Sequence, residues 1–222
     1  MNLKNALAIM VKAPEPGRVK TRFTPPLSPE EAATLYRCFI EDFFLNISPL
    51  ASKEVDIFAA YTPAGGLDKF DSIAAEGVQF FPQEGDLLGD RIFNVFRSLF
   101  NKGYKKVAIT GSDSPDLPIG RIKEAFLILK KKNVDIVLGP ATDGGYYLVA
   151  MKGLNEAPFI KIPWSTGRVL KATLKRAGEA GLKCELLDPW HDMDRVEDLK
   201  FLKDNPHTKK TSEFLKTLGR SH

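Results

Sequence analysis

Short runs of apolar residues alternate along this chain with longer segments in which apolar residues recur every three or four positions. The short runs predict six strands, at Leu7–Val11, Val55–Ala60, Val78–Phe81, Val107–Thr110, Ile136–Leu138 and Tyr146–Met151. Strands that alternate with helices are typical of a mainly parallel sheet whose faces are covered by the connecting helices. We therefore expect an α/β fold of three layers, in which a twisted, doubly wound sheet lies between two layers of helices.

The clearest helix signal begins at Ser28. Ser28 can cap a helix, Pro29 suits its first position, and Glu31 completes a capping box. A buried stripe is then indicated by apolar residues spaced four apart, at Leu35, Phe39, Phe43 and Ile47. Further helices are predicted at Ile92–Leu99 and Ile122–Leu129 and near residues 168–179, 195–203 and 208–218.

Composition narrows the class of protein. The length of 222 residues suits one domain, and 43% hydrophobic with 27% charged residues is ordinary for a soluble globular protein. The net charge of +4 is small, and most basic residues are interleaved with acidic ones, which argues against a nucleic-acid partner. The apolar run Ala6–Val11 is too short for a signal peptide, and no run approaches a membrane span. Cys38 and Cys184 match no metal-binding or redox spacing, so we expect buried thiols in a cytoplasmic protein.

The loop after the first predicted strand is rich in cations. In doubly wound sheets, ligands bind beyond the carboxyl ends of the strands, where such loops converge. Residues 12–22 read KAPEPGRVKTR, and their cations are Lys12, Arg18, Lys20 and Arg22. Prolines stiffen the backbone and Gly17 permits a tight turn, so cations held in this way could stabilise the charge of a diphosphate. The alternative is a solvated basic loop without a binding role.

An acidic loop, GSDSPD at residues 111–116, follows the strand at Val107–Thr110. A carboxylate at the end of a central strand can hold Mg²⁺ or Mn²⁺, because phosphates and water supply the remaining ligands. We interpret Asp113 as such a ligand. The alternative is that Asp113 and Asp116 shape the turn into the next helix, and for Asp116 this structural role is a good interpretation.

Three further positions have both an ordinary and a functional interpretation. The sequence DGG at residues 143–145 is typical of a tight hairpin turn, yet glycines also let the backbone approach a ligand closely. Trp164 can belong to the core or form the wall of a pocket. Asp194, with Glu197 three residues later, is typical of a helix start, and capping alone would explain it.

Several enzyme classes lack their sequence signature in this chain. The first loop contains neither GxxxxGK nor GxGxxG, which argues against a P-loop kinase and a Rossmann dehydrogenase. The acidic loop does not match GxSxG, and His191 is the one histidine outside the terminal region. Covalent serine or cysteine catalysis and a His/Cys metal cluster are therefore not indicated.

Five motifs taken together resemble the DUF2064 family. They are KAPEPGRVKTR at 12–22, GSDSPDL at 111–117, GPATDGGYY at 139–147, IPWST at 162–166 and DMDRVEDL at 192–199. That family is classed with the GT-A nucleotide-diphospho-sugar transferases, which have a Rossmann-like fold, and some members are assigned as glycosyltransferases of arsenosugar biosynthesis. The resemblance covers Leu7 to about Leu202, and it implies a single GT-A-like domain over residues 1–222.

The same layout is similar, more distantly, to molybdenum-cofactor guanylyltransferases and phospholactate guanylyltransferases. By this resemblance Asp113 is the principal metal ligand and Asp194 a second candidate. The nucleotide phosphates would face Lys12, Arg18, Lys20 and Arg22, and the sugar or acceptor would face Asp143, Gly144 and Gly145. Those relatives commonly have Thr-Pro where this chain has Arg195-Val196, and the glycine pattern of the sugar nucleotidyltransferases is reduced to Gly17. Both departures weaken the expectation of nucleotidyl transfer.

The sequence leads to three hypotheses. The leading one is a glycosyltransferase dependent on Mg²⁺ or Mn²⁺ that moves a sugar from a nucleotide-diphospho-sugar to a small acceptor, with Asp143 as candidate general base and Trp164 near the acceptor. The alternative is a nucleotidyltransferase that releases pyrophosphate from a nucleoside triphosphate. The third is nucleotide or nucleic-acid binding without catalysis, although no aromatic residues are interleaved with the basic ones. No membrane partner is expected, and formation of a homo-oligomer is left open.

Overall fold

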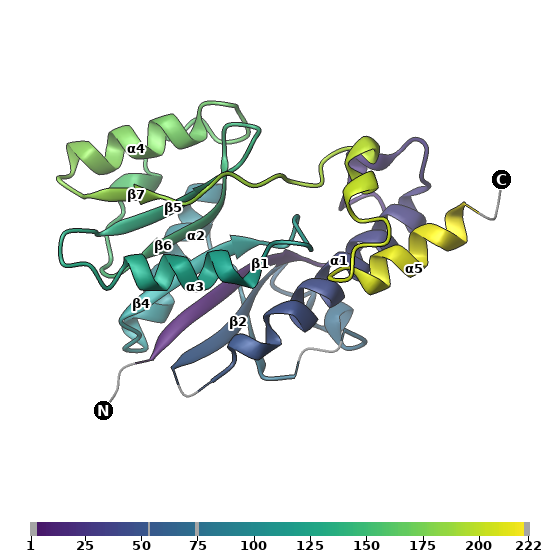
Figure 1. Cartoon of the computed structure of the whole chain (residues 1–222), viewed down its shortest axis with the longest axis horizontal. Helices are drawn as coiled ribbons and strands as arrows, with labels where there is room; N and C mark the ends of the chain where they lie inside the picture. Colours follow the sequence, from purple (N-terminus) through teal and green to yellow (C-terminus); the bar gives the residue numbers. More distant parts are fainter. Residues whose placement is uncertain (1–3, 53, 74–75, 220–222) are drawn as a thin grey trace.

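The computed structural model describes residues 4–52, 54–73 and 76–219, which contain a seven-stranded sheet (Figure 1). Its strands are β1 (Asn5–Lys12), β2 (Val55–Thr62), β3 (Val78–Pro82), β4 (Lys106–Gly111), β5 (Ile136–Pro140), β6 (Tyr146–Met151) and β7 (Cys184–Leu186). They are arranged in the order β3-β2-β1-β4-β6-β5-β7. Neighbouring strands are parallel, except that β6 runs antiparallel to both β4 and β5. The mainly parallel sheet predicted from the sequence is confirmed.

The antiparallel strand follows from the tight turn at residues 141–145. The Ala141 N–H donates to the Gly145 carbonyl at 3.0 Å, and the Gly144 N–H donates to the Ala141 carbonyl at 3.2 Å. The hairpin interpretation of this sequence is therefore confirmed. Strand β7 was not predicted, because its three residues are too few to give an apolar pattern.

Helices cover both faces of the sheet. They are α1 (Pro29–Ile47), α2 (Leu88–Asn101), α3 (Ile119–Ile128), α4 (Val169–Glu179) and α5 (Lys209–Leu218). Leu7 of β1 packs in one core with residues of α1 and α3, while its neighbour Ala8 packs in a second core with residues of α2. Side chains of a strand alternate between its two faces, so this separation gives the three layers expected. In the part of the chain that is described, no helix combines the length and apolarity needed to cross a membrane.

Two sequence expectations need correction. The helix predicted near 195–203 is a 3₁₀-helix, η5 (Val196–Phe201), whose backbone bonds span three residues, as from the Asp198 N–H to the Arg195 carbonyl at 3.0 Å. The two cysteines were expected to be buried, and both are only partly buried. Cys38 lies outside the buried stripe of α1, and Cys184 lies on an edge strand.

Helix α1 anchors both the site and the end of the chain. Its capping box is formed as predicted, because the Ser28 hydroxyl accepts the Glu31 N–H at 3.1 Å and the Glu31 carboxylate accepts the Ser28 N–H at 2.7 Å. Figure 1 shows α5 lying beside α1. The buried Asp42 carboxylate accepts the N–H groups of Lys210 and Thr211, each at 2.9 Å, and so fixes the start of α5.

Candidate functional site

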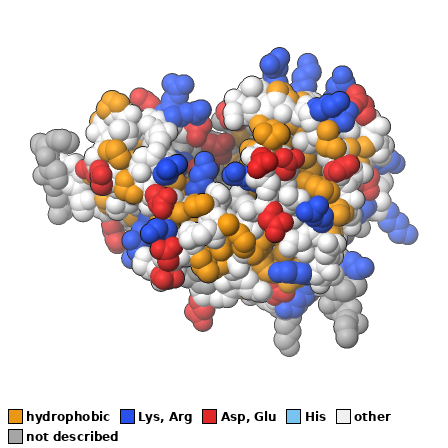
Figure 2. Space-filling view, turned by 180° about the vertical axis from the view of Figure 1, so that it is seen from behind, with side chains coloured by type: hydrophobic (Ala, Val, Ile, Leu, Met, Phe, Trp, Pro, Cys, Tyr) orange, Lys and Arg blue, Asp and Glu red, His pale blue; other side chains and the backbone are white. Residues whose placement is uncertain are grey.

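A cavity of about 460 Å³ lies where the loops at the carboxyl ends of the parallel strands converge. Figure 2 shows a hollow in the surface with basic and acidic side chains around it. The cavity is lined by most of the residues singled out from the sequence, namely Lys12, Arg18, Lys20, Asp113, Asp143, Gly145 and Trp164. Asp194 lines a smaller adjoining cavity of about 120 Å³. Arg22 and Gly144 line neither of these two cavities.

The first loop presents two cations without acidic partners. Gly17 has a φ of +71°, and the Arg18 N–H donates to the Glu15 carbonyl at 3.0 Å, so the loop turns tightly. Lys12 and Arg18 are exposed, and among the described residues no carboxylate lies within ion-pair distance of either side chain. These two side chains are therefore free to meet an anionic ligand in the cavity.

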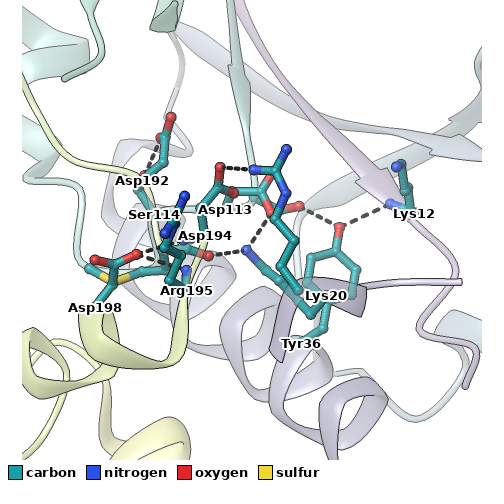
Figure 3. Close-up of polar contacts among 12 residues, drawn as sticks. Lys12, Lys20, Tyr36, Asp113, Ser114, Asp192, Asp194, Arg195 and Asp198 are labelled. Carbon is teal, nitrogen blue, oxygen red and sulfur yellow. Dashed lines mark hydrogen bonds and ion pairs between the residues drawn. The ribbon is translucent and has the colours of Figure 1, made fainter. Parts of the chain in front are cut away.

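Lys20 and Arg22 are placed differently from these two cations. The Lys20 Nζ lies 2.7 Å from Asp113 Oδ1 and donates to the Met193 carbonyl at 2.6 Å (Figure 3). Arg22 Nη1 lies 2.7 Å from Asp194 Oδ2, in an exposed ion pair. Both contacts link the first loop to the segment near residue 193, a link that no local sequence pattern indicated.

Asp113 lies in the loop directly after β4 and lines the cavity. The Asp113 side chain is 53% exposed. It lies at a concave part of the surface, because it is one of the residues that line the cavity. Burial by itself would raise the pKa of Asp113, but the charge and hydrogen bond of Lys20, with the charge of Lys12, outweigh it and hold the pKa below the usual value. Asp113 is therefore a carboxylate at neutral pH.

Asp192 is a cavity residue that sequence reasoning did not single out. Its Oδ1 accepts the Ser114 hydroxyl at 2.9 Å. Burial raises its pKa to about 6, and the Ser114 hydrogen bond opposes this rise, whereas the negative charges of Asp113, Asp143 and Asp194 add to it. Its presence within the motif at residues 192–199 was the one sequence signal that could have identified it. Asp113, Asp143 and Asp192 thus line the cavity, and Asp194 lines the adjoining smaller one.

The donor chemistry of these carboxylates fits a hard divalent cation. Carboxylate oxygens are the ligands preferred by Mg²⁺ and Mn²⁺, and a cation would relieve the mutual repulsion that contributes to the raised pKa of Asp192. Within the described residues, no group of three or more His, Cys, Asp or Glu side chains is placed so that it could hold a metal ion by itself. Mg²⁺ commonly needs only one or two carboxylates when phosphates and water complete its shell. Asp113 and Asp194 could therefore hold a metal together with a phosphate ligand.

The hairpin turn contributes Asp143 to the cavity and ties it to α4. Asp143 Oδ1 accepts the Gly145 N–H at 2.8 Å, which stabilises the turn. Gly144 has a φ of +90°, its carbonyl accepts the Leu170 N–H at 3.0 Å, and a Cβ there would collide with the backbone of Gly167. The two interpretations of this sequence therefore hold together, since one turn both reverses the chain and lines the cavity.

Trp164 also has both roles considered for it. Its indole is partly buried and packs against the core beneath α2, where a Cβ on Gly89 would lie 2.8 Å from its Nε1. The ring meets that of Tyr146 edge-on, with 6.2 Å between the ring centroids, and both residues line the cavity. Trp164 is thus a core residue whose exposed part forms a cavity wall.

Asp194 and Asp116 differ in their roles. Asp194 does not cap the segment that follows it, because it is Asp198 whose carboxylate accepts the N–H groups of Asp194 at 3.1 Å and Arg195 at 2.8 Å. This corrects the capping interpretation and leaves the Asp194 carboxylate at the smaller cavity. Asp116 is buried, and its Oδ2 lies 2.9 Å from His191 Nε2, in keeping with the structural role considered for it.

Comparison with known proteins gives one clear family match. Residues 47–166 match the family described as an uncharacterized protein conserved in bacteria, DUF2064. The structure resembles that of a proposed nucleotide-diphospho-sugar transferase from Desulfovibrio desulfuricans G20, with 30% sequence identity, a TM-score of 0.87, and coverage of 97% of this chain and 95% of that one. No curated protein matches the sequence.

More distant structures share the fold. A cytidylyltransferase from Leptospira borgpetersenii has a TM-score of 0.60 at 10% identity, with 99% of this chain and 95% of that chain covered. A 4-diphosphocytidyl-2C-methyl-D-erythritol synthase has a TM-score of 0.59 at 10% identity, with coverage of 91% and 97% respectively. At such low identity, the two structures are informative about the fold alone.

Proposed function

This chain belongs to the DUF2064 family, and from that premise we propose that it transfers a sugar from a nucleotide-diphospho-sugar to a small acceptor with the help of Mg²⁺ or Mn²⁺. The similar structures support the coarser statement of a transferase that uses nucleotide-type substrates. One observation supports placing this activity at the cavity: Lys12 and Arg18, which have no ion-pair partner among the described residues, line the same cavity as the carboxylates of Asp113, Asp143 and Asp192. Such an arrangement suits a diphosphate, because a cationic loop and a carboxylate-bound metal can neutralise it from two sides.

Lys12 and Arg18 would contact the diphosphate and stabilise the negative charge that develops as it leaves. Arg22 lines neither cavity and forms an exposed ion pair with Asp194, so its contact with a phosphate stays a prediction from the sequence. Asp113 and Asp194 would hold the metal, with Asp192 beside them. When bound, the metal would neutralise phosphate oxygens and so improve the leaving group.

The acceptor would lie on the β6 side of the cavity, where Asp143, Gly145 and Trp164 line the wall. Asp143 is the candidate general base, because its second carboxylate oxygen, Oδ2, has no hydrogen-bond partner among the described residues. Gly144 would act indirectly, since it keeps the turn close to α4. The apolar side chains of Ile109 and Val149 complete the wall and limit the access of water.

Nucleotidyl transfer is the second candidate, and its support is at the level of the fold, which this chain shares with a cytidylyltransferase. It would use the same cations and metal but a nucleoside triphosphate. The products separate the two reactions, since glycosyl transfer releases a nucleoside diphosphate whereas nucleotidyl transfer releases pyrophosphate. Nucleotide binding without either product would leave a non-catalytic nucleotide-binding protein.

A thermal-shift panel of nucleotides and nucleotide sugars, with and without Mn²⁺, tests the proposal. A ligand at 100 times its Kd should raise the Tm by roughly 5 °C or more, and only when Mn²⁺ is present. Asp113→Ala should abolish the shift, whereas Asp68→Ala should retain it, because Asp68 is exposed and lines neither cavity. Arg18→Gln should weaken diphosphates far more than nucleosides. An unchanged response in Asp113→Ala would contradict the assigned metal site.

A further inference from the structure

Lys20 is a cation that is already neutralised inside the protein. Its side chain is only 6% exposed, although it belongs to a loop whose other cations are exposed. Its Nζ lies 5.5 Å from the ring centroid of Phe23, 6.0 Å from that of Tyr36 and 5.1 Å from that of Phe39. These rings surround the ammonium at cation–π distance and would attract its charge.

The polar partners of Lys20 come from two loops that are distant in sequence. One is Asp113 Oδ1 at 2.7 Å, and the other is the Met193 carbonyl at 2.6 Å. The Met193 N–H also donates to the Asp113 backbone carbonyl at 3.2 Å, so Lys20 strengthens a junction that the backbone already makes. That junction sets the spacing between Asp113 and the neighbouring Asp192 and Asp194 (Figure 3).

Without a nucleotide, a metal ion would compete with the Lys20 ammonium for the Asp113 carboxylate. A divalent cation on Asp113 would stand close to a fixed positive charge, and in the described part of the chain no group of three or more His, Cys, Asp or Glu side chains is placed to compensate for it. A phosphate ligand would add oxygen donors and two or more negative charges, which would shift the balance toward the metal.

We propose that Lys20 is an internal counter-ion for Asp113, a positioning residue that joins Asp113 to the backbone of Met193 and prevents the site from retaining a divalent cation until a nucleotide diphosphate is bound. This role replaces the phosphate contact predicted for Lys20 from the sequence. It rests on the proposed function for its nucleotide ligand, but its effect on the metal is measurable without any nucleotide.

The test compares the Kd for Mn²⁺ alone, from the free-ion signal in electron paramagnetic resonance, in the wild type and in Lys20→Met. Methionine fills the space between the three rings without the charge, so the fold should be kept. We expect Lys20→Met to bind Mn²⁺ alone roughly fivefold more tightly or better, while the gain in Mn²⁺ affinity on adding a nucleoside diphosphate shrinks. Lys12→Met is the matched control, because it removes a cation of the same loop that does not contact Asp113, and its Kd for Mn²⁺ should change much less.

Two results would overturn the proposal. One is an unchanged or weaker affinity of Lys20→Met for Mn²⁺ alone, with circular dichroism showing a folded protein. The other is a loss of diphosphate binding without metal in Lys20→Met as large as that in Arg18→Gln, which would make Lys20 a phosphate ligand. Lys20→Gln, which keeps polarity without charge, replaces Lys20→Met if the latter does not fold. If no nucleotide binds to the wild type at all, the proposed function fails, whereas the comparison with Mn²⁺ alone still decides the role of Lys20.

Discussion

The hydroxyl of Tyr36 on α1 lies 2.7 Å from the hydroxyl of Ser112, directly beside Asp113. The same Tyr36 oxygen accepts the Lys12 N–H at 3.1 Å. Ser112 donates its single hydroxyl proton to the Met10 carbonyl at 3.2 Å, so Tyr36 is the donor in the bond between the two hydroxyls. Burial raises the pKa of Tyr36 far above its usual range, and the charge of Asp113 adds to the rise, so the hydroxyl remains a neutral donor. One buried side chain therefore joins the cationic loop to the loop of Asp113.

Tyr36→Phe should remove the hydrogen bonds that join these two loops. The Lys12 N–H loses its acceptor and Ser112 loses its donor, so the free energy of unfolding should fall by about 1–2 kcal/mol in urea titrations. Binding of a nucleoside diphosphate with Mn²⁺ should weaken as well, because Tyr36 no longer holds the two loops in fixed positions relative to each other.

Tyr104→Phe is the matched control for this prediction. The Tyr104 hydroxyl also donates a hydrogen bond, to Asp56 Oδ2 at 2.7 Å, but it lies away from the cavity. We expect a similar loss of stability with unchanged ligand affinity. Equal effects of the two variants on ligand affinity would mean that Tyr36 has no special role in the site.

The parts of the site that sequence patterns predicted are those set by local structure. Apolar runs located six strands, and with a parallel sheet they placed Lys12 and Asp113 at the same edge. The DGG turn gave the hairpin, because a tight turn needs a residue that tolerates a positive φ, and Gly144 adopts +90° there. These features depend on residues close together in the chain, so the sequence itself carries the information.

The features that were missed depend on long-range contacts. Lys20 meets Met193, 173 positions away, and nothing in the basic loop distinguishes this buried cation from the exposed Arg18. Asp192 became a site residue because Ser114 and three carboxylates lie around it in the folded chain. Tertiary packing decides which cation is free and which is paired. The periodicity of the sequence carries no information about that packing.

Asp56 should give the protein an acid-sensitive contribution to stability. Burial would raise the pKa of Asp56, but hydrogen bonds from Lys4 and Tyr104 and the charge of Lys4 outweigh it, so its pKa in the folded state lies below the ordinary 3.8. A carboxylate whose pKa is lower in the folded state stabilises the fold at pH values above its pKa in the unfolded state. This stabilisation is lost as the pH falls through its pKa in the folded state. Asp56→Asn should therefore cost roughly 1–2 kcal/mol near pH 7, and the cost should shrink below about pH 4.

Urea unfolding of the wild type and Asp56→Asn between pH 7 and pH 3 measures this difference directly. The two curves of stability against pH should be parallel from neutral pH to about pH 5 and should converge on further acidification. A difference that stays constant or widens toward pH 3 would contradict the assignment, because it would show that protonation of Asp56 costs the folded state nothing.

Gly89 should control the position of Trp164 in the cavity wall. It lies in the first turn of α2, where an added Cβ would be 2.6 Å from the Phe159 carbonyl oxygen and 2.8 Å from Trp164 Nε1. Neither neighbour can move freely, since one is backbone and the other a packed indole, so Gly89→Ala should lower the free energy of unfolding by about 1–3 kcal/mol. Relief of the clash should push Trp164 toward the cavity, changing its fluorescence and weakening nucleotide-sugar binding more than nucleoside-diphosphate binding.

Gly120→Ala is the control in α3, because its Cβ would meet no atom within 4 Å, and it should be neutral or stabilising by up to about 1 kcal/mol. If both variants behave alike, the close contact at Gly89 does not position the tryptophan.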